Sequence, residues 1–273
     1  MTDRYAVIGN PISHSKSPWI HTQFAQIAQQ DMAYTAMEGC LDGFEDDVRT
    51  FAAQGGRGLN VTIPFKERAF AMATHRSERA ATAGAVNALK LENGKILAEN
   101  FDGVGLMRDV QANLGFSLKS KRVLILGAGG ATRGMLQPLS QCEPSHVLVA
   151  NRTPERAFRL QKELGHLGPI DACGWTDIAG TFDVVFNATA ASLGGVLPPL
   201  AANLLTPDGL AYDLVYGKGR TAFLQWALDT APQSKRADGV GMLVEQAAEA
   251  FAWWRGVRPD TQPIIKAMST IPV

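Results

Sequence analysis

The stretch Lys121 to Met135 reads K-R-V-L-I-L-G-A-G-G-A-T-R-G-M and decides the fold of the chain. Its apolar run, Val123 to Leu126, is typical of a strand buried on both faces of a parallel sheet. A glycine-rich turn follows at once, and a helical pattern begins at Ala131. This order places backbone N–H groups and the positive end of a helix dipole around one anion. It therefore predicts a phosphate cradle made of Gly127, Ala128, Gly129, Gly130 and Ala131.

The glycine pattern matches G-x-G-x-x-G only in part, because Thr132 occupies the third glycine position. On these residues alone, an ordinary strand-to-helix loop is the alternative. The next strand favours a nucleotide site. Val147 to Ala150 is apolar, and it ends about 20 residues beyond the turn, where NAD enzymes carry an acidic residue for the ribose 2′-hydroxyl.

Asn151, Arg152 and Thr153 follow that strand in place of an acid, and Arg156 comes one turn later. A carboxylate would repel a 2′-phosphate, whereas a guanidinium group binds it with two hydrogen bonds. We therefore predict NADP rather than NAD as the cofactor. The alternative is that both arginines are solvated residues of a helix start, although Thr153 and Pro154 explain that start without them.

Composition limits the remaining function classes. The chain has 273 residues, 46% of them hydrophobic, which suffices for one large domain or two modest ones. Its 26 basic and 26 acidic residues balance, so no nucleic-acid or membrane partner is indicated. Cys40, Cys142 and Cys173 form no C-x-x-C pair, so we predict neither a disulfide framework nor a metal site. With no leader and no membrane-length apolar run, we expect a cytoplasmic protein.

The first part of the chain alternates strands and helices. We predict strands at 5–8, 34–37 and 58–61 and helices at 18–29 and 44–53, followed by a hairpin that turns at Asn93-Gly94. This β-α-β-α-β order predicts a mostly parallel sheet with helices as crossovers.

Polar residues follow the predicted first and third strands. Ser17 suits an N-cap before Pro18, which explains it structurally. Ser15 and Ser17 could also hold a small carboxylate together with the free N–H groups of the helix start. Lys66 lies just beyond the third strand, at the edge where α/β sheets bind ligands. Asp102 follows the hairpin, and it is either the N-cap of the next helix or the acid partner of Lys66.

Together these segments resemble the shikimate dehydrogenase family. The shared motifs keep one order along the chain: Gly9-Asn10-Pro11, Ser15-Lys16-Ser17-Pro18, Asn60-Val61-Thr62-Ile63-Pro64-Phe65-Lys66, Gly84-Ala85-Val86-Asn87, Asp102-Gly103, Gly127-Ala128-Gly129-Gly130-Ala131, Asn151-Arg152-Thr153 and Asp238-Gly239-Val240-Gly241-Met242-Leu243. The resemblance implies an α/β fold with an N-terminal substrate-binding domain, a C-terminal NADP-binding Rossmann domain and a cleft between them. We assign residues 1–102 and 238–273 to the substrate domain and 103–237 to the cofactor domain.

The resemblance also implies an activity, the reversible NADPH-dependent reduction of 3-dehydroshikimate to shikimate in chorismate and aromatic amino acid biosynthesis. Lys66 and Asp102 would act together as acid and base. The implied substrate residues are Ser15, Ser17 and Tyr216 for the carboxylate, and Thr62, Asn87 and Gln246, besides Lys66 and Asp102, for the rest of the ring. The implied cofactor residues are the cradle, Asn151, Arg152, Thr153, Arg156, Thr189, Leu214 and Gly239. For Gln246, a solvated helix position is the alternative.

The chain departs from the family pattern at two places. Phe101 stands where a threonine usually precedes the catalytic aspartate, and this change predicts an altered affinity or substrate range. Ala190 and Ala191 follow Thr189 where a small hydroxyl residue is usual, which predicts one cofactor contact fewer. The alternative functions are a quinate/shikimate dehydrogenase of broader specificity and a non-catalytic metabolite-binding relative. We expect a monomer or a homodimer.

Overall fold

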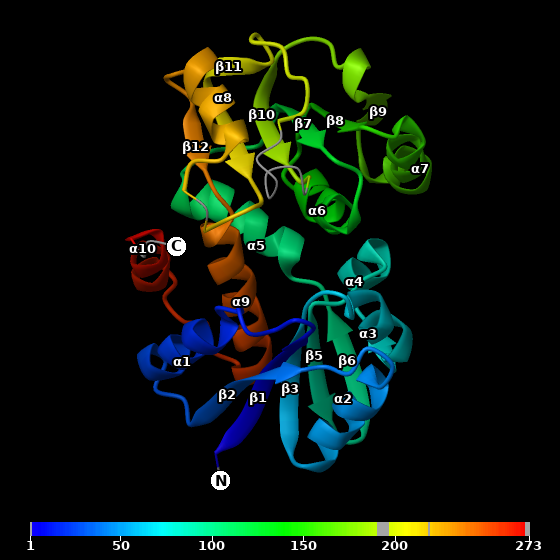
Figure 1. Cartoon of the computed structure of the whole chain (residues 1–273), viewed down its shortest axis with the longest axis vertical. Coiled ribbons are helices and arrows are strands. Elements are labelled where there is room, and N and C mark those ends of the chain that lie inside the picture. The colour runs from blue at the N-terminus through cyan, green and yellow to red at the C-terminus, as the bar shows by residue number, and fades with distance from the viewer. Residues whose placement is uncertain (1, 190–196, 218, 271–273) are drawn as a thin grey trace. The chain divides into compact units, whose positions relative to one another are not determined.

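The computed structural model describes residues 2–189, 197–217 and 219–270 (Figure 1). The chain divides into two compact units, Met1–Gly105 with Leu243–Ala267 and Leu106–Met242 with Met268–Val273. Within the described residues, each unit is built on one six-stranded sheet. The two α/β sheets confirm the predicted fold class.

The first unit contains the strands β1 (Asp3–Gly9), β2 (Met32–Glu38), β3 (Gly56–Val61), β4 (His75–Arg76), β5 (Ala88–Glu92) and β6 (Lys95–Glu99). Its helices are α1 (Ser17–Ile27), α2 (Phe44–Ala53), α3 (Lys66–Met72) and α4 (Glu78–Ala83), with most of α9 (Val240–Arg255) and α10 (Gln262–Thr270). The strands follow the order β2-β1-β3-β5-β6-β4. β1 runs parallel to β2 and β3, whereas β5 is antiparallel to both of its neighbours.

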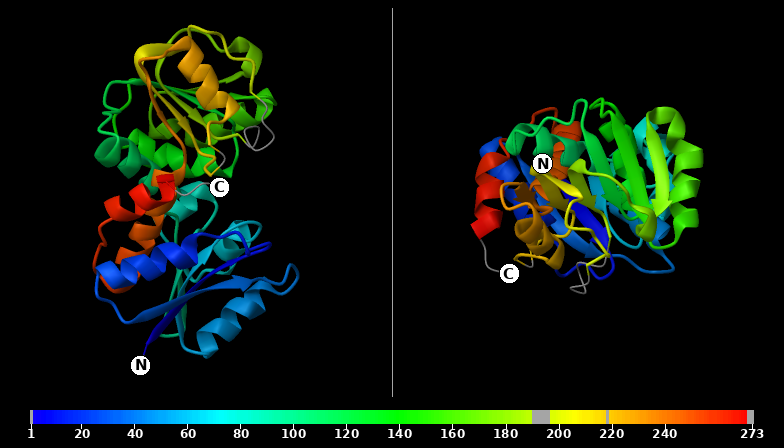
Figure 2. Two further views of the ribbon diagram at one scale, coloured as in Figure 1. Left: turned by 60° about the vertical axis from the view of Figure 1, so that its left-hand side comes forward. Right: turned by 90° about the horizontal axis from the view of Figure 1, so that it is seen from above.

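Alternate residues of β1 point to opposite faces of this sheet, as the pleat requires. Ala6 and Ile8 pack with the apolar side chains of α2, α3 and α4. Tyr5 and Val7 lie on the other face, where Tyr5 stacks on Trp254 of α9. The sheet is therefore covered on both faces, and Figure 2 shows α1 and α2 on its opposite sides.

His21 of α1 is completely buried on the second of these faces. Its ring stacks on Tyr34 with 4.2 Å between the centroids and 4° between the planes, and neither ring nitrogen forms a hydrogen bond. Burial lowers the pKa of His21 from 6.5 to about 3. The folded chain therefore holds a neutral imidazole at a pH at which the unfolded chain begins to bind a proton.

We expect His21→Leu to reduce the acid sensitivity of the fold. Between the two pKa values the unfolded chain binds more protons, so stability is lost as the pH falls below 6.5. From about pH 7 to about pH 5, this linkage costs the wild type roughly 2 kcal/mol that the variant keeps. Urea unfolding at the two pH values measures the difference. The exposed His75, changed to leucine, serves as the control, and an equal pH dependence of wild type and His21→Leu would contradict the assignment.

The second unit contains the strands β7 (Arg122–Leu126), β8 (His146–Asn151), β9 (Ile170–Gly174), β10 (Phe182–Asn187), β11 (Leu205–Asp213) and β12 (Lys235–Ala237). Its helices are α6 (Gly130–Ser140), α7 (Pro154–Leu164) and α8 (Ala222–Thr230), with short 3₁₀ turns at Gly165–Leu167 and Trp175–Asp177. Helix α5 (Asp102–Arg108, continued by a π-helix at Asp109–Asn113) begins in the first unit and enters the second unit at Leu106. All strand pairs are parallel, in the order β12-β11-β10-β7-β8-β9. Counted within the unit, this is the 3-2-1-4-5-6 order of Rossmann folds.

The predicted nucleotide strand β7 lies in the middle of this sheet. Val123 and Ile125 pack on α5, α6 and α7, whereas Leu124 and Leu126 pack on the side of α8. The unbroken apolar run is explained by this burial on both faces.

One predicted cap is wrong. The N-cap of α1 is Lys16, and Ser17 is already the first helical residue, with Pro18 behind it. The backbone N–H of Ser17 donates to Oγ of Ser15 at 3.3 Å, so the serine two residues earlier satisfies this donor. At the other end of the chain, Gly256 follows α9 in the left-handed conformation (φ 71°) and ends the helix.

Candidate active site

Three segments of the first unit bring polar side chains to one edge of its sheet. Strand β3 ends at Val61 and leads to Lys66, the first residue of α3. Strand β6 runs parallel to β3, because both are antiparallel to β5, and it leads to Asp102 at the start of α5. Asn87 precedes β5 and so lies at the same edge. The edge beyond the carboxyl ends of β3 and β6 therefore collects the predicted catalytic residues.

Lys66 and Asp102 form an ion pair with 2.6 Å between Nζ and Oδ2. Their side chains are 29% and 20% exposed, so the pair is half-buried but accessible. The other carboxylate oxygen, Oδ1, accepts a hydrogen bond of 2.8 Å from the side-chain amide of Asn87. Asp102 is thus held on both oxygens, and it in turn orients the ammonium group.

Asn87 is the centre of this arrangement. It is 3% exposed, and its Oδ1 accepts from the backbone N–H of Phe101 at 2.9 Å. Its Nδ2 also donates to Oε1 of Gln246 at 3.2 Å. Gln246 is 9% exposed and donates to the carbonyl of Leu243, so the alternative of a solvated position is wrong. The amphipathic pattern of α9 gave no signal for this contact.

A buried support behind Asp102 was not predicted. Oδ1 of Asn100 accepts from the backbone N–H of Asp102 at 3.1 Å, and its Nδ2 donates to the carbonyl of Ala85. The N–H of Asn100 donates to the carboxylate of Glu99, which is buried and paired with Arg79 at 2.7 Å. These contacts fix the backbone from which the Asp102 side chain reaches Lys66.

The remaining substrate candidates of the first unit differ in exposure. Ser15 and Thr62 are half-buried, whereas Ser17 is only 8% exposed. The N–H of Thr62 donates to the carbonyl of Ile8, which joins the loop after β3 to the end of β1. Ser15 accepts from the Ser17 N–H, so its own hydroxyl proton is available to a ligand.

Phe101 replaces the usual threonine beside Asp102. Its ring is 4% exposed and packs edge-to-face on Trp253, with the guanidinium of Arg79 over it at 5.7 Å. The Phe101 ring therefore belongs to the core. The residue contacts the side chains around Lys66 and Asp102 through its backbone N–H, which donates to Asn87.

The glycine-rich turn of the second unit has room for an anion. A side chain at Gly129 or Gly130 would meet no atom within 4 Å, so the space in front of α6 is open. Gly127 has a φ of 105° and approaches the backbone of Ala188. Thr132, the departure from the glycine pattern, is fully buried and donates to the carbonyl of Gly127 at 2.7 Å. The threonine thus braces the turn, and the turn fits a pyrophosphate.

The residues after β8 have two kinds of role: Asn151 supports the glycine-rich turn, whereas Arg152 and Arg156 are exposed. Oδ1 of Asn151 accepts from the N–H of Ala128 at 3.1 Å, so this side chain holds the turn. Thr153 is the N-cap of α7, but its side chain makes no capping bond. Arg152 and Arg156 are exposed and form no ion pair within the described residues, so both guanidinium groups are available to a phosphate.

The other predicted cofactor residues of this unit lie after β10 and β11. Thr189 bonds to Oδ1 of Asn187 through both its N–H and its hydroxyl. A side chain at Gly239 would come within 2.3 Å of the Leu214 carbonyl, so this close approach requires glycine. Ala190 and Ala191 lie outside the described residues. Tyr216 is 39% exposed, and its partial burial raises the pKa of the phenol.

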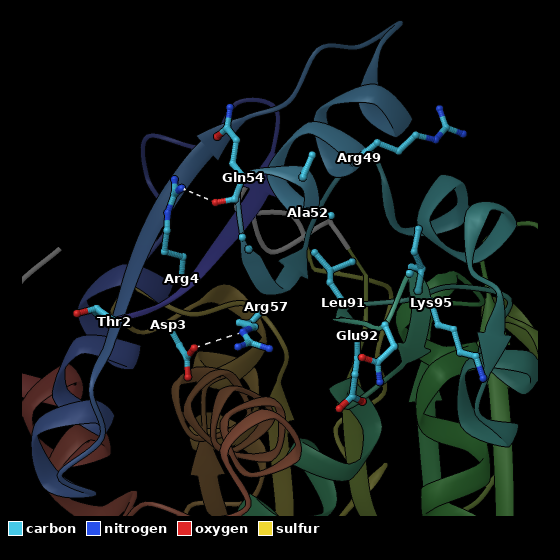
Figure 3. Close-up of a pocket in the computed structure, with 16 residues that line it drawn as sticks. Thr2, Asp3, Arg4, Arg49, Ala52, Gln54, Arg57, Leu91, Glu92 and Lys95 are labelled. Atoms are coloured by element: carbon cyan, nitrogen blue, oxygen red, sulfur yellow. Dashed lines mark hydrogen bonds and ion pairs between the residues drawn. The ribbon is translucent and has the colours of Figure 1, made fainter.

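A hollow of about 640 Å³ lies elsewhere on the first unit (Figure 3). It is lined by residues where β1 and β3 begin and by the β5–β6 turn, away from the strand ends that carry the polar group. Two of the cations that line it have partners, because Arg4 donates to the carbonyl of Gln54 and Arg57 pairs with Asp3. The hollow therefore adds nothing to the site around Lys66.

Two further kinds of feature are absent from the described ranges. No helix there is both long and apolar enough to cross a membrane. No three of its His, Cys, Asp or Glu side chains gather closely enough to hold a metal ion.

Family models match three parts of the chain. Residues 7–89 match the shikimate dehydrogenase substrate binding domain, 109–196 the shikimate / quinate 5-dehydrogenase model, and 239–268 the shikimate 5′-dehydrogenase C-terminal domain. A relative from Methylococcus capsulatus, named shikimate dehydrogenase (NADP(+)), is 53% identical over 97% of this chain and 96% of its own. The chain belongs to the shikimate dehydrogenase family. The resemblance seen in the sequence is thereby confirmed.

Two solved structures agree with the fold. The crystal structure of an Ael1 enzyme from Pseudomonas putida is 54% identical, with a TM-score of 0.95 and 99% of both chains covered. The shikimate 5-dehydrogenase of Thermus thermophilus, solved with NADP(H) and shikimate, is 32% identical, with a TM-score of 0.88 over 98% of this chain and 99% of that one. Both units therefore have counterparts in a solved shikimate dehydrogenase.

Proposed function

We propose that the chain catalyses the reversible NADPH-dependent reduction of 3-dehydroshikimate to shikimate, in chorismate and aromatic amino acid biosynthesis. The observation that carries the proposal is the accessible ion pair of Lys66 and Asp102, with Asn87 on the second carboxylate oxygen. Near-complete matches to shikimate dehydrogenases support it. The proposal includes a cytoplasmic enzyme that works as a monomer or a homodimer.

Lys66 has two roles in the proposed reaction. NADPH, when bound, supplies the hydride that adds to the ketone carbon. Negative charge then grows on the ketone oxygen, and the Lys66 ammonium stabilises it and delivers a proton. Asp102 orients the ammonium and accepts a hydrogen bond from a ring hydroxyl. In the reverse direction the pair takes up the hydroxyl proton of shikimate.

The neighbouring side chains hold the rest of the substrate. Ser15 offers a free hydroxyl proton to the carboxylate, and we assign Ser17 and Tyr216 to the same group. Thr62, Asn87 and Gln246 provide neutral hydrogen bonds to the ring. Because Asn87 and Gln246 are bonded to each other and buried, they present these bonds with little loss of side-chain freedom.

We assign NADP to the second unit. The open space at Gly129 and Gly130 suits the pyrophosphate at the N-terminus of α6. Arg152 and Arg156 suit a 2′-phosphate, because they are exposed and have no competing carboxylate among the described residues. Thr189, Leu214 and Gly239 are assigned to the nicotinamide half by family resemblance. Accordingly, we propose 103–237 as the cofactor domain and the remainder as the substrate domain.

Reduction of NADP⁺ with shikimate and with quinate, measured side by side, tests the proposal. We expect kcat/KM for shikimate to exceed that for quinate by at least about tenfold, because the buried polar groups are fixed for one pattern of hydroxyls. Comparable values would favour the quinate/shikimate dehydrogenase, an alternative that the name of the model matching residues 109–196 keeps open. Shikimate binding without turnover would favour the non-catalytic relative.

A further inference from the structure

The hydroxyl of Tyr34 lies behind the candidate site, on β2. The residue is 9% exposed, and its hydroxyl oxygen is 2.6 Å from Oδ1 of Asn60. Burial raises the pKa of Tyr34 well above its ordinary value, so the phenol stays protonated. The amide oxygen of Asn60 has no proton to give, and the phenol is therefore the donor.

Asn60 connects Tyr34 to the candidate site. Its Nδ2 donates to the backbone carbonyl of Asn87 at 3.2 Å. The side chain of Asn87 donates in turn to Asp102, which pairs with Lys66. A continuous series of hydrogen bonds thus runs from Tyr34 to the ammonium group.

The Tyr34 proton decides which way the Asn60 amide faces. An amide presents an acceptor on one side and two donors on the other. With the phenol proton on Oδ1, the NH₂ group faces the Asn87 carbonyl. If the amide were flipped, Oδ1 of Asn60 would face the carbonyl oxygen of Asn87, and two acceptors would oppose each other. Asn60 and Asn87 are only 6% and 3% exposed, so water does not replace the phenol at the Asn60 amide oxygen, whereas the Asn87 carbonyl keeps the bond of 2.9 Å from the Val61 N–H.

The Tyr34 ring is itself fixed in place. His21 stacks on one face of it, and Trp254 lies with its ring centroid 6.4 Å away. The Ser17 side chain approaches the same hydroxyl and partly offsets the effect of burial on the Tyr34 pKa. The phenol therefore sits between Asn60 and a residue assigned to the substrate carboxylate.

We propose that Tyr34 is a positioning residue of the active site, whose hydroxyl fixes the Asn60 amide and through it Asn87, Asp102 and Lys66. The inference rests on the function proposed above. Tyr34 acts through other residues and has no chemical step of its own.

Tyr34→Phe tests the inference, because it removes one oxygen and keeps the ring that stacks on His21. We expect kcat/KM for shikimate to fall about tenfold, as the buried acceptor on Asn60 loses its donor. The KM for NADP⁺ should stay unchanged, since the series lies in the first unit. A purely structural role would not separate the two substrates.

Tyr5→Phe is the matched control. Tyr5 pairs in register with Tyr34 on the neighbouring strand and is 4% exposed, but its hydroxyl faces Arg255. The Tyr5→Phe substitution should leave kcat/KM for shikimate unchanged. In an Asn60→Ala background, Tyr34→Phe should have little further effect, because the residue through which it acts is gone.

Several outcomes would overturn the inference: a Tyr34→Phe enzyme as active as the wild type, an equal loss from Tyr5→Phe, or the same loss in the Asn60→Ala background. Each of these leaves the proposed function intact, because the wild type still oxidises shikimate. A wild type that fails to turn over shikimate refutes the proposed function, and the positioning role falls with it. Circular dichroism of each variant at the assay temperature confirms that it is folded.

Discussion

Lys66→Ala is expected to lower turnover of shikimate by about 10²–10⁴-fold, the usual contribution of a positioned acid–base group. The substitution removes the ammonium that lies 2.6 Å from Asp102 and leaves the carboxylate bonded to Asn87 alone. Developing charge on the ketone oxygen then has neither a cation nor a proton source. Steady-state rates with saturating shikimate and NADP⁺ measure the loss.

NADPH binding distinguishes a loss of catalysis from a general loss of folded enzyme. Lys66→Ala should bind NADPH as the wild type does in a fluorescence titration, because the cofactor residues belong to the second unit. Lys90→Ala is the control, since Lys90 also pairs with a carboxylate, Glu92, in the β5–β6 hairpin. Near-wild-type turnover of Lys66→Ala would remove this lysine from the mechanism.

The candidate site could be predicted from sequence only where it depends on strand ends. A ligand edge follows from the order of strands and helices, and Lys66 lies directly behind one strand of that edge. The contact between Asn87 and Gln246 spans 159 residues, and that between Tyr34 and Asn60 depends on strands that are neighbours of β1 on opposite sides. No local pattern encodes these distances. The residues alone left Asp102 as either a helix N-cap or the partner of Lys66, and only the resemblance to a family favoured the pair.

The fold was predictable where apolar runs are long. Strand β7 is apolar because both of its faces are buried, and the sequence shows this directly. Strand β4 has two exposed residues, and β9 lies at the edge of its sheet and is only partly apolar. Such strands are stabilised by pairing with a neighbour rather than by their own pattern, so they were missed. The role of Thr132 could not be predicted from sequence either. It departs from the glycine motif, but its hydroxyl stabilises the turn by donating to the Gly127 carbonyl.

Arg152→Ala is expected to raise the KM for NADP⁺ about ten- to 100-fold and to leave kcat/KM for NAD⁺ unchanged. The guanidinium is exposed beyond β8 and has no ion-pair partner among the described residues, so its charge is available to a 2′-phosphate. NAD⁺ lacks that phosphate and should not respond. The ratio of kcat/KM for the two cofactors, in wild type and variant, measures the effect.

Arg159→Ala is the matched control, because Arg159 is exposed on α7 one turn beyond Arg156 and lies near Glu163. It should change neither cofactor's KM. Arg156→Ala should have an intermediate effect if both arginines share the phosphate, and the double variant should then approach the activity with NAD⁺. A wild type that uses NAD⁺ as well as NADP⁺, or an Arg152→Ala enzyme that loses both equally, would show that the cation after β8 supports the loop and does not select the cofactor.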